Sequence, residues 1–246
     1  MYTGPVPSSV WKATLRAAHA HLLAIGEVTY AASTLQDSFY QIFLLVISME
    51  RRFDDPRYQV FSKGIFQDHA LAIWHSLQSD HHQREMALAA LVSLPSHLKL
   101  RRTIKSLQWA KTKASKLAEY RNLLAHTPIK FRWDDRKSTL VPVFSGHGMR
   151  KAHQRKLELV GGLQLWRTIR NDLLNLSNYV DGVCAQCERL GLADRGVDLV
   201  GPSRTWPGKP RLRSLRRLHE ISTRSSPPAS PTARRPRRRP ASKRSP

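Results

Sequence analysis

Residues 163–190 read LQLWRTIRNDLLNLSNYVDGVCAQCERL, and this stretch decides the fold class. Its apolar residues recur every seven positions in two series. A seven-residue repeat places both series on one side of a helix, where they can pack against neighbouring helices. We therefore expect a long helix over 163–190, packed with others in an antiparallel bundle. The two series are Trp166, Leu173, Val180 and Cys187, and Ile169, Leu176, Val183 and Leu190.

Two further helices are expected in the first 77 residues, because apolar or small residues recur there at spacings of three and four. The first extends from Trp11 to Met49, as one helix or as two abutting helices with a bend at Gly26. Pro56 ends this pattern by restricting the residue before it. The second helix covers 61–77, with apolar residues at Phe66, Ala70, Ile73, Trp74 and Leu77.

A third helix is expected to begin at Ser79 or Asp80, either of which can cap its first turn, and to run towards Pro95. Gln83 follows Asp80 by three residues and is placed as its capping-box partner. A fourth helix spans about 96–126. We expect its buried face to consist of Leu107, Ala110, Ala114, Leu117, Ala118 and Ala125.

The segment between the fourth and the last helix differs from the rest of the chain. Residues 129–144, IKFRWDDRKSTLVPVF, alternate like two strands around an Asp-Asp-Arg-Lys turn. This pattern predicts a short hairpin or an extended loop. The expected fold class is therefore all-α: an antiparallel helical bundle of about five helices, with this hairpin or loop after the fourth helix.

The composition is that of a folded protein with a strong positive charge. The 246 residues include 41 Lys and Arg against 18 Asp and Glu, a formal net charge of +23, and 41% are apolar. That apolar share excludes a wholly disordered chain, and two cysteines exclude a disulfide scaffold. The longest mainly apolar run, 39–49, is shorter than the ~20 residues of a membrane span. Because 1–16 also lacks the features of a secretory signal, we expect a cytoplasmic protein without membrane contact.

The charge is unevenly distributed along the chain. Residues 201–246 hold 14 Lys and Arg, one acidic residue and nine of the 15 prolines, with RRPRRRP at 234–240. Too few apolar residues remain there to offset the entropy lost on ordering. We expect a helical bundle over 1–200 and a disordered basic tail over 201–246. Such a tail either attracts nucleic acid by counterion release or only keeps the protein soluble, and the sequence leaves both open.

The residues with the clearest chemical content form the hexapeptide RNLLAH at 121–126. On a helical wheel Arg121 lies in the middle of the apolar stripe. Asn122 and His126 are four residues apart and share a face, so three polar groups can converge at the end of the fourth helix. The alternative is structural: Arg121 pairs with a buried carboxylate such as Asp37 or Asp80, and His126 caps the last carbonyls.

The hexapeptide resembles the Arg-x4-His signature of HEPN domains, and the long helices around it extend the resemblance over about residues 10–192. The resemblance implies an all-α bundle that often dimerises, with two motif copies across a shared cleft, and metal-independent RNA cleavage in active members. By that analogy His126 is the general base or acid, Arg121 stabilises charge on the phosphate and Asn122 orients one of them. Many members are instead non-catalytic binding or partner-recognition modules.

From this resemblance we expect an endoribonuclease of a toxin or defence type that acts on RNA as a homodimer, with an antitoxin as a further partner and no cofactor. The alternative is a non-catalytic bundle that binds nucleic acid or a protein. Lys130, Phe131, Arg132 and Trp133 follow the motif helix and are the candidate RNA-binding residues, because aromatic rings stack on bases beside cations. Phe131 and Trp133 alternatively only close the end of the bundle.

No metal site is expected. Cys184 and Cys187 lack a second pair of ligands at zinc-binding spacing. Cys187 also falls on the apolar seam of the last helix, where a buried small side chain is the simpler interpretation. The pairs His19 and His21, and His81 and His82, are expected to be solvated or to cap helices.

Overall fold

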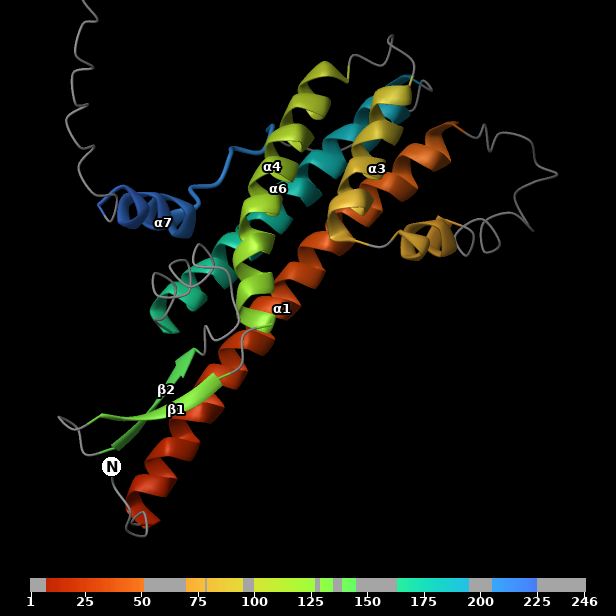
Figure 1. Cartoon of the computed structure of the whole chain (residues 1–246). Helices are drawn as coiled ribbons and strands as arrows, with labels where there is room; N and C mark the ends of the chain where they lie inside the picture. The colour runs from red at the N-terminus through yellow and green to blue at the C-terminus, as the bar shows by residue number, and fades with distance from the viewer. Residues whose placement is uncertain are drawn as a thin grey trace, which may run out of the picture.

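The computed structural model is a bundle of helices with one small hairpin (Figure 1). Its helices are α1 (Ser8–Glu50), α3 (Asp80–Ser93), α4 (Arg101–His126), α6 (Leu163–Asp194) and α7 (Arg213–Arg224), with a further helical segment at 70–76. Its strands are β1 (Ile129–Asp134) and β2 (Thr139–Phe144). The structure describes residues 8–50, 70–77, 79–94, 100–126, 129–134, 139–144, 163–194 and 205–224.

The first helix is not interrupted at its glycine. α1 continues through Gly26 as one helix of 43 residues, so it is the single helix and not the two abutting helices that the sequence also allowed. Glycine in a helix interior destabilises it by about 1 kcal/mol relative to alanine. The buried neighbours Ala24 and Val28 offset that loss by packing in the core. At 1.5 Å per residue, α1 is about 65 Å long.

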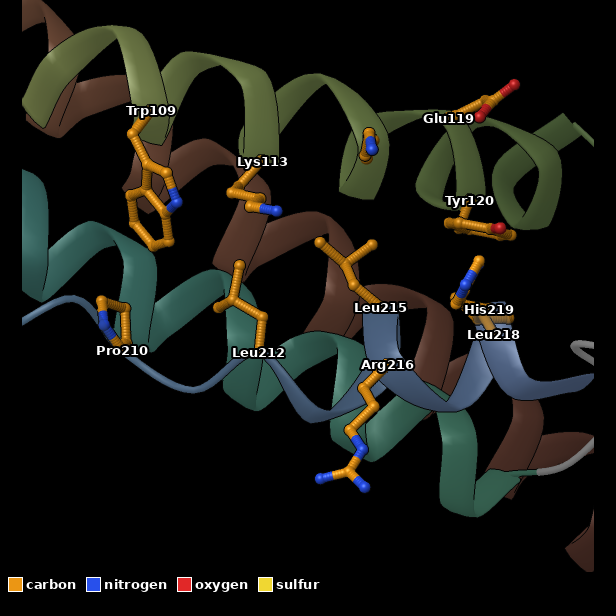
Figure 2. Close-up of a pocket in the computed structure, with 11 residues that line it drawn as sticks. Trp109, Lys113, Glu119, Tyr120, Pro210, Leu212, Leu215, Arg216, Leu218 and His219 are labelled. Atoms are coloured by element: carbon orange, nitrogen blue, oxygen red, sulfur yellow. The ribbon is translucent and has the colours of Figure 1, made fainter. Parts of the chain in front are cut away.

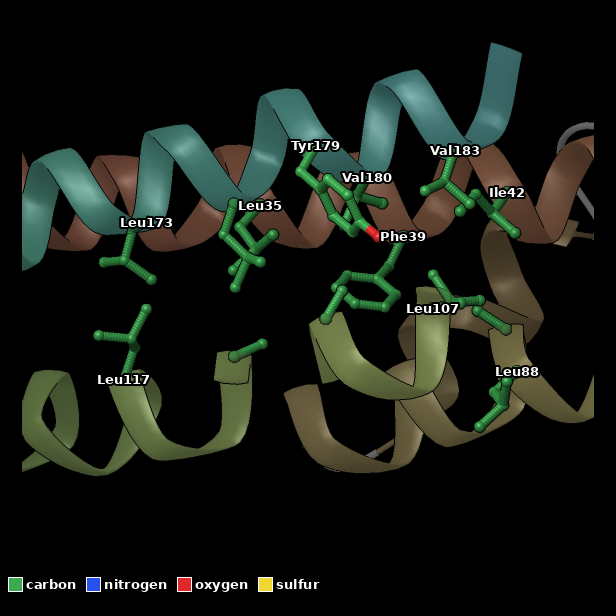
Figure 3. Packing of buried hydrophobic residues seen from close by; sticks show 14 of the residues in the cluster. Leu35, Phe39, Ile42, Leu88, Leu107, Leu117, Leu173, Tyr179, Val180 and Val183 are labelled. Atoms are coloured by element: carbon green, nitrogen blue, oxygen red, sulfur yellow. The ribbon is translucent and has the colours of Figure 1, made fainter. Parts of the chain in front are cut away.

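The core forms where α1, α4 and α6 meet, as Figure 3 shows. Seven of the eight residues predicted to form the α6 seam are buried, and Leu190 is partly buried against the same core. The prediction of a helix that packs along this seam is confirmed. Each fully buried aliphatic or aromatic side chain contributes about 1.5–3 kcal/mol. Among the largest of these side chains are Trp166, Phe39, Ile42, Leu107, Leu117 and Leu173.

A polar cluster ties α3 to the rest of the bundle. Ser79 caps α3 by accepting a hydrogen bond from the backbone of His82. Gln83 is not a capping-box partner: its side chain donates to the Trp74 carbonyl and accepts a hydrogen bond from Gln36 of α1. Arg84 donates to the same Gln36 side chain at 3.1 Å. These buried groups fix how α3 and residues 70–76 pack on α1.

Residues 70–76 confirm part of the predicted second helix; its residues 61–69 lie outside the described stretches. Ala70 and Trp74 are buried, whereas Ile73, expected on the apolar face, is half exposed. The fourth helix follows its predicted stripe through Leu117. The prediction fails at Ala125, which is exposed. This end of α4 leads into the hairpin, beside the N-terminal half of α1 (Figure 1).

The predicted hairpin is present. β1 and β2 pair antiparallel, with Ile129 opposite Phe144 and Asp134 opposite Thr139. Because only two residues separate His126 from the start of β1, the hairpin extends directly from the C-terminal end of α4. None of the described helices is both long and apolar enough to span a bilayer.

The prediction of disorder throughout 201–246 is wrong for residues 205–224. These residues run along α4 and α6 and end in α7, where Ser214 and Leu218 are buried. Asp172 of α6, itself 2% exposed, accepts hydrogen bonds from the backbone of Arg213 and from the backbone and hydroxyl of Ser214. A carboxylate at a helix N-terminus satisfies free N–H groups and favours the helix dipole. Residues 225–246 of the predicted tail lie outside the described stretches.

The approach to α7 is also determined by the sequence of α6. Pro207 packs so closely on Gly182 that a β-carbon at position 182 would lie 3.1 Å from the proline ring. Arg102 of α4 covers the ring of Trp206 at 4.5 Å, a cation–π contact. Residues 205–212 are thus held between α4 and α6 without forming a helix, and they belong to the folded body.

Candidate nucleic-acid interface

The motif arginine is engaged in an ion pair. Arg121 of α4 donates to the Asp80 carboxylate of α3, with the two side chains 22% and 39% exposed. Asp80 is one of the two carboxylates that the sequence offered as a structural partner. The pair joins the last turns of α4 to the first turn of α3.

A second arginine lies next to this pair. Arg84 is 3% exposed, and burial lowers the pKa of its guanidinium, while the nearby Asp80 raises it. The Nε atoms of Arg84 and Arg121 are both buried without a hydrogen-bond partner. Asp80 therefore balances two cations, which explains why the guanidinium of Arg121 turns towards α3.

The motif residues do not all face the same space. Arg121 and Asn122 line a pocket of about 490 Å³ together with Asp80, His81 and Arg84. His126 is exposed and is not among the residues that line it. The structure thus brings Arg121 and Asn122 together with acidic Asp80, but it leaves the imidazole outside the pocket.

The residues predicted to bind RNA extend from the motif helix on β1. Lys130, Phe131 and Arg132 are exposed, with Phe131 at 43%. Trp133 is half buried. Phe131 therefore has the surface that stacking on a base requires, whereas Trp133 belongs more to the packing of the hairpin.

Positive charge is concentrated on two neighbouring elements. α4 and residues 205–224 contain 13 Lys and Arg and two acidic residues. By contrast, α1, α3 and α6 together contain six Lys and Arg and nine acidic residues. The exposed cations of α4 and residues 205–224 are Arg101, Arg102, Lys105, Lys116, Lys209, Arg211, Arg213, Arg216 and Arg217.

Between these two elements lies a cleft of about 630 Å³, which we call the α4–α7 cleft (Figure 2). One wall comes from α4, with Trp109, Lys113 and Tyr120. The other comes from residues 210–219. This cleft was not predicted from the sequence, because its second wall lies in the segment predicted to be disordered. The three-residue spacing of Leu212, Leu215 and Leu218 was the signal that pointed to an ordered helix there.

The cysteines do not have the properties of a reactive site. Cys187 is fully buried, as the seam predicted. Burial raises the pKa of Cys184 to about 12 and that of Cys187 to about 11, so both stay protonated at neutral pH. The described part of the chain contains no group of three or more His, Cys, Asp or Glu side chains arranged to hold a metal ion.

The histidine pairs make local contacts. His21 hydrogen-bonds the Ala17 carbonyl at 2.8 Å and packs edge-on against Trp166. The His82 ring contacts the capping hydroxyl of Ser79. The exposed His19, His81 and His82 agree with the expectation that these histidines are solvated or cap helices. The expectation is wrong for His21, which lies inside α1 and packs on the core.

Comparison with known proteins found no family model that matches the chain, no curated protein similar to it in sequence and no solved structure similar to it in fold. The HEPN resemblance therefore stays a prediction that rests on RNLLAH at 121–126 and on the surrounding helices.

Proposed function

We propose that this protein is a helical bundle that binds RNA without cleaving it, through α4 and residues 205–224. The observation that carries this proposal is the segregation of charge: 13 cations against two acids on these two elements, and a net negative balance on α1, α3 and α6. A polyanion that neutralises such a surface releases its counterions, which provides affinity without sequence discrimination. RNA is the class of polyanion that the HEPN resemblance indicates.

The state of the motif supports binding over catalysis. A guanidinium that stabilises a reacting phosphate must be available to it, and Arg121 is already paired with Asp80. A general base must reach the 2′-hydroxyl beside the same phosphate, and His126 lies outside the pocket that Arg121 lines. Arg121 acts in this proposal as a structural link between α3 and α4.

Binding is tested by fluorescence anisotropy with a fluorescein-labelled 12-nucleotide RNA in EDTA, at 50 and 200 mM salt. We expect saturable binding at 50 mM salt, a loss of affinity of at least tenfold at 200 mM, and RNA that remains intact on a denaturing gel. Absence of binding at 50 mM salt, or an affinity that salt does not change, contradicts the proposal.

Metal-independent cleavage remains the second prediction, favoured by the presence of Arg121 and Asn122 in one pocket. The same gel tests it. Cleavage in EDTA to 2′,3′-cyclic phosphate ends that disappears in His126→Ala would replace the binding proposal by the nuclease one. The exposed His75 offers a control, because His75→Ala removes an imidazole from residues 70–76 and leaves the motif intact.

The assembly and location of the protein belong to the same set of proposals. A homodimer and an antitoxin partner follow from the HEPN resemblance alone. The proposal also places the protein in the cytoplasm. Sedimentation equilibrium of the full chain measures the first of these directly: a mass of 28.1 kDa is the monomer.

A further inference from the structure

The α4–α7 cleft has features that general electrostatic attraction does not need. Its two walls come from parts of the chain that are about 100 residues apart, and their relative position is determined by specific contacts: the Asp172 cap of α7 and the packing of Pro207 on Gly182. A purely electrostatic surface can tolerate mobile cations, whereas this cleft has a defined shape.

The interior of the cleft combines flat rings with an apolar surface. Figure 2 shows Trp109 and Pro210 at one end, Tyr120 and His219 at the other, and Leu215 between them. The Trp109 ring is oriented by an edge contact with Tyr179 of α6, with centroids 5.2 Å apart. The volume of the cleft, about 630 Å³, is within the ~300–1,000 Å³ range of small-ligand pockets.

The border of the cleft is cationic. Lys209 and Lys113 place their ammonium groups 5.4 and 6.0 Å from the centre of the Trp109 ring. Lys116 and Arg216 also line the cleft, and Glu119 is the one acid among its described lining residues. An apolar, aromatic interior with an excess of cations at its border suits a ligand that is flat at one end and anionic at the other.

We propose that the α4–α7 cleft binds one unpaired nucleotide of a single-stranded nucleic acid, with the base inside against Leu215 and the rings, and the phosphates at Lys113 and Lys116. This inference rests on the proposed function and adds to it that the ligand is single-stranded. A duplex keeps its bases stacked and paired, so it cannot offer a base to a cleft of this kind without unpairing it.

The position of the cleft relates it to the motif pocket. Glu119 lines both, because the two spaces lie on either side of the C-terminal half of α4. A strand bound in the cleft therefore needs to cross only one helix, about 10 Å in diameter, to reach Asn122.

The experiment measures the affinity of the full-length protein for a 12-nucleotide RNA, the same sequence as DNA, and a 12-base-pair RNA duplex. Leu215→Trp fills the cleft without changing the charge. We expect it to weaken binding of both single strands at least tenfold and to leave duplex binding within twofold. A second variant, Lys113→Ala with Lys116→Ala, should weaken binding of the single strands at least tenfold and that of the duplex threefold or less, because it also removes two charges from α4.

Arg101→Ala with Lys105→Ala is the matched control, because it removes two exposed cations from the same helix away from the cleft. We expect a loss of threefold or less. If the two double variants lose equal affinity for the single strands and Leu215→Trp binds them like the wild type, the cleft inference is overturned. The proposal that the protein binds RNA would then remain. If Leu215→Trp weakens the binding of the RNA strand alone, the ligand is RNA. If it weakens the binding of both the RNA and the DNA strand, the cleft recognises the base and the phosphate, which both strands contain.

Two further outcomes are decisive. If the wild-type protein binds none of the three probes at 50 mM salt, both the proposed function and the cleft inference fail. If polyglutamate binds as tightly as the single strands and is weakened equally by the cleft variants, the site takes acidic peptide and the inference fails. Circular dichroism melting of each variant shows that it is folded under the conditions of the assay.

Discussion

At the scale of single residues, the sequence identified Arg121 correctly as an anomaly but left its role open. An arginine within an apolar stripe needs a partner, and the helical wheel showed that much. The partner is Asp80, a residue 41 positions away that only the packing of α3 on α4 brings close. Local spacing could name Asp37 and Asp80 as candidates, and the fold chooses between them.

The ion pair predicts a specific coupling. Arg121→Ala leaves Asp80 beside a single cation and should lower the free energy of unfolding by about 1–2 kcal/mol. His126→Ala, at an exposed position, should change it by less than about 0.5 kcal/mol, because surface side chains contribute little to stability. Urea denaturation measures both. The double variant Arg121→Ala with Asp80→Ala should lose less than the sum of the two singles, and strict additivity would argue against the pair.

The two thiols predict a pH dependence. Their ordinary pKa is 9.0, and burial raises it to about 12 for Cys184 and about 11 for Cys187. Between pH 9 and 11 the unfolded chain therefore releases protons that the folded protein retains, so stability falls as pH rises through this window. We expect the urea midpoint of the wild type to fall more between pH 8 and 10 than that of Cys184→Ala.

A thiol reagent tests the same burial more directly. At pH 8 the folded protein should react with Ellman's reagent at least tenfold more slowly than the protein in urea, because thiolate is the reactive form. Fast labelling of two thiols in the folded state would contradict the partial burial of Cys184 and the full burial of Cys187.

At the scale of elements, the sequence predicted what repeats and missed what depends on a distant partner. The seven-residue series of α6 and the alternation of the hairpin are local patterns, and both predicted elements are present. α7 was missed because prolines and arginines dominate the composition of 201–246. Its N-terminal cap is Asp172, about 40 residues earlier in α6, and no local pattern reveals such a contact.

The cap predicts how α7 can be released. Asp172→Ala removes the acceptor of three hydrogen bonds and should destabilise the docking of residues 205–224 by about 1–3 kcal/mol. We expect trypsin to cleave at Arg211 to Arg217 at least tenfold faster than in the wild type. Asp181→Ala, which removes an exposed carboxylate from the same helix, is the control and should leave the cleavage rate unchanged.

At the scale of the whole molecule, the described structure places the boundary of the folded body beyond position 200. Residues 205–224 contribute the buried Leu218 and one wall of the α4–α7 cleft. A chain that ends at 200 should therefore melt at a lower temperature than the full protein. A chain that ends at 224 should melt within about 2 °C of it, because the contacts of α7 are kept.

The same truncation measures how residues 225–246 contribute to binding. They contain seven Lys and Arg and no acid. If they contact phosphates, the chain that ends at 224 should bind RNA more weakly, and the slope of log affinity against log salt should fall by about 0.7 per lost contact with a single strand. An unchanged slope would show that these residues take no part in binding nucleic acid.

The docking of α7 limits how far the arginines that begin at 234 can lie from the cleft. Because α7 is anchored by Asp172, position 224 is attached close to the cleft, and only nine residues separate it from the arginines that begin at 234. A chain of that length cannot exceed about 35 Å. Those arginines are thus tethered to the cleft at a local concentration on the order of a millimolar. A polymer bound in the cleft by one nucleotide therefore meets a second group of cations before it can diffuse away.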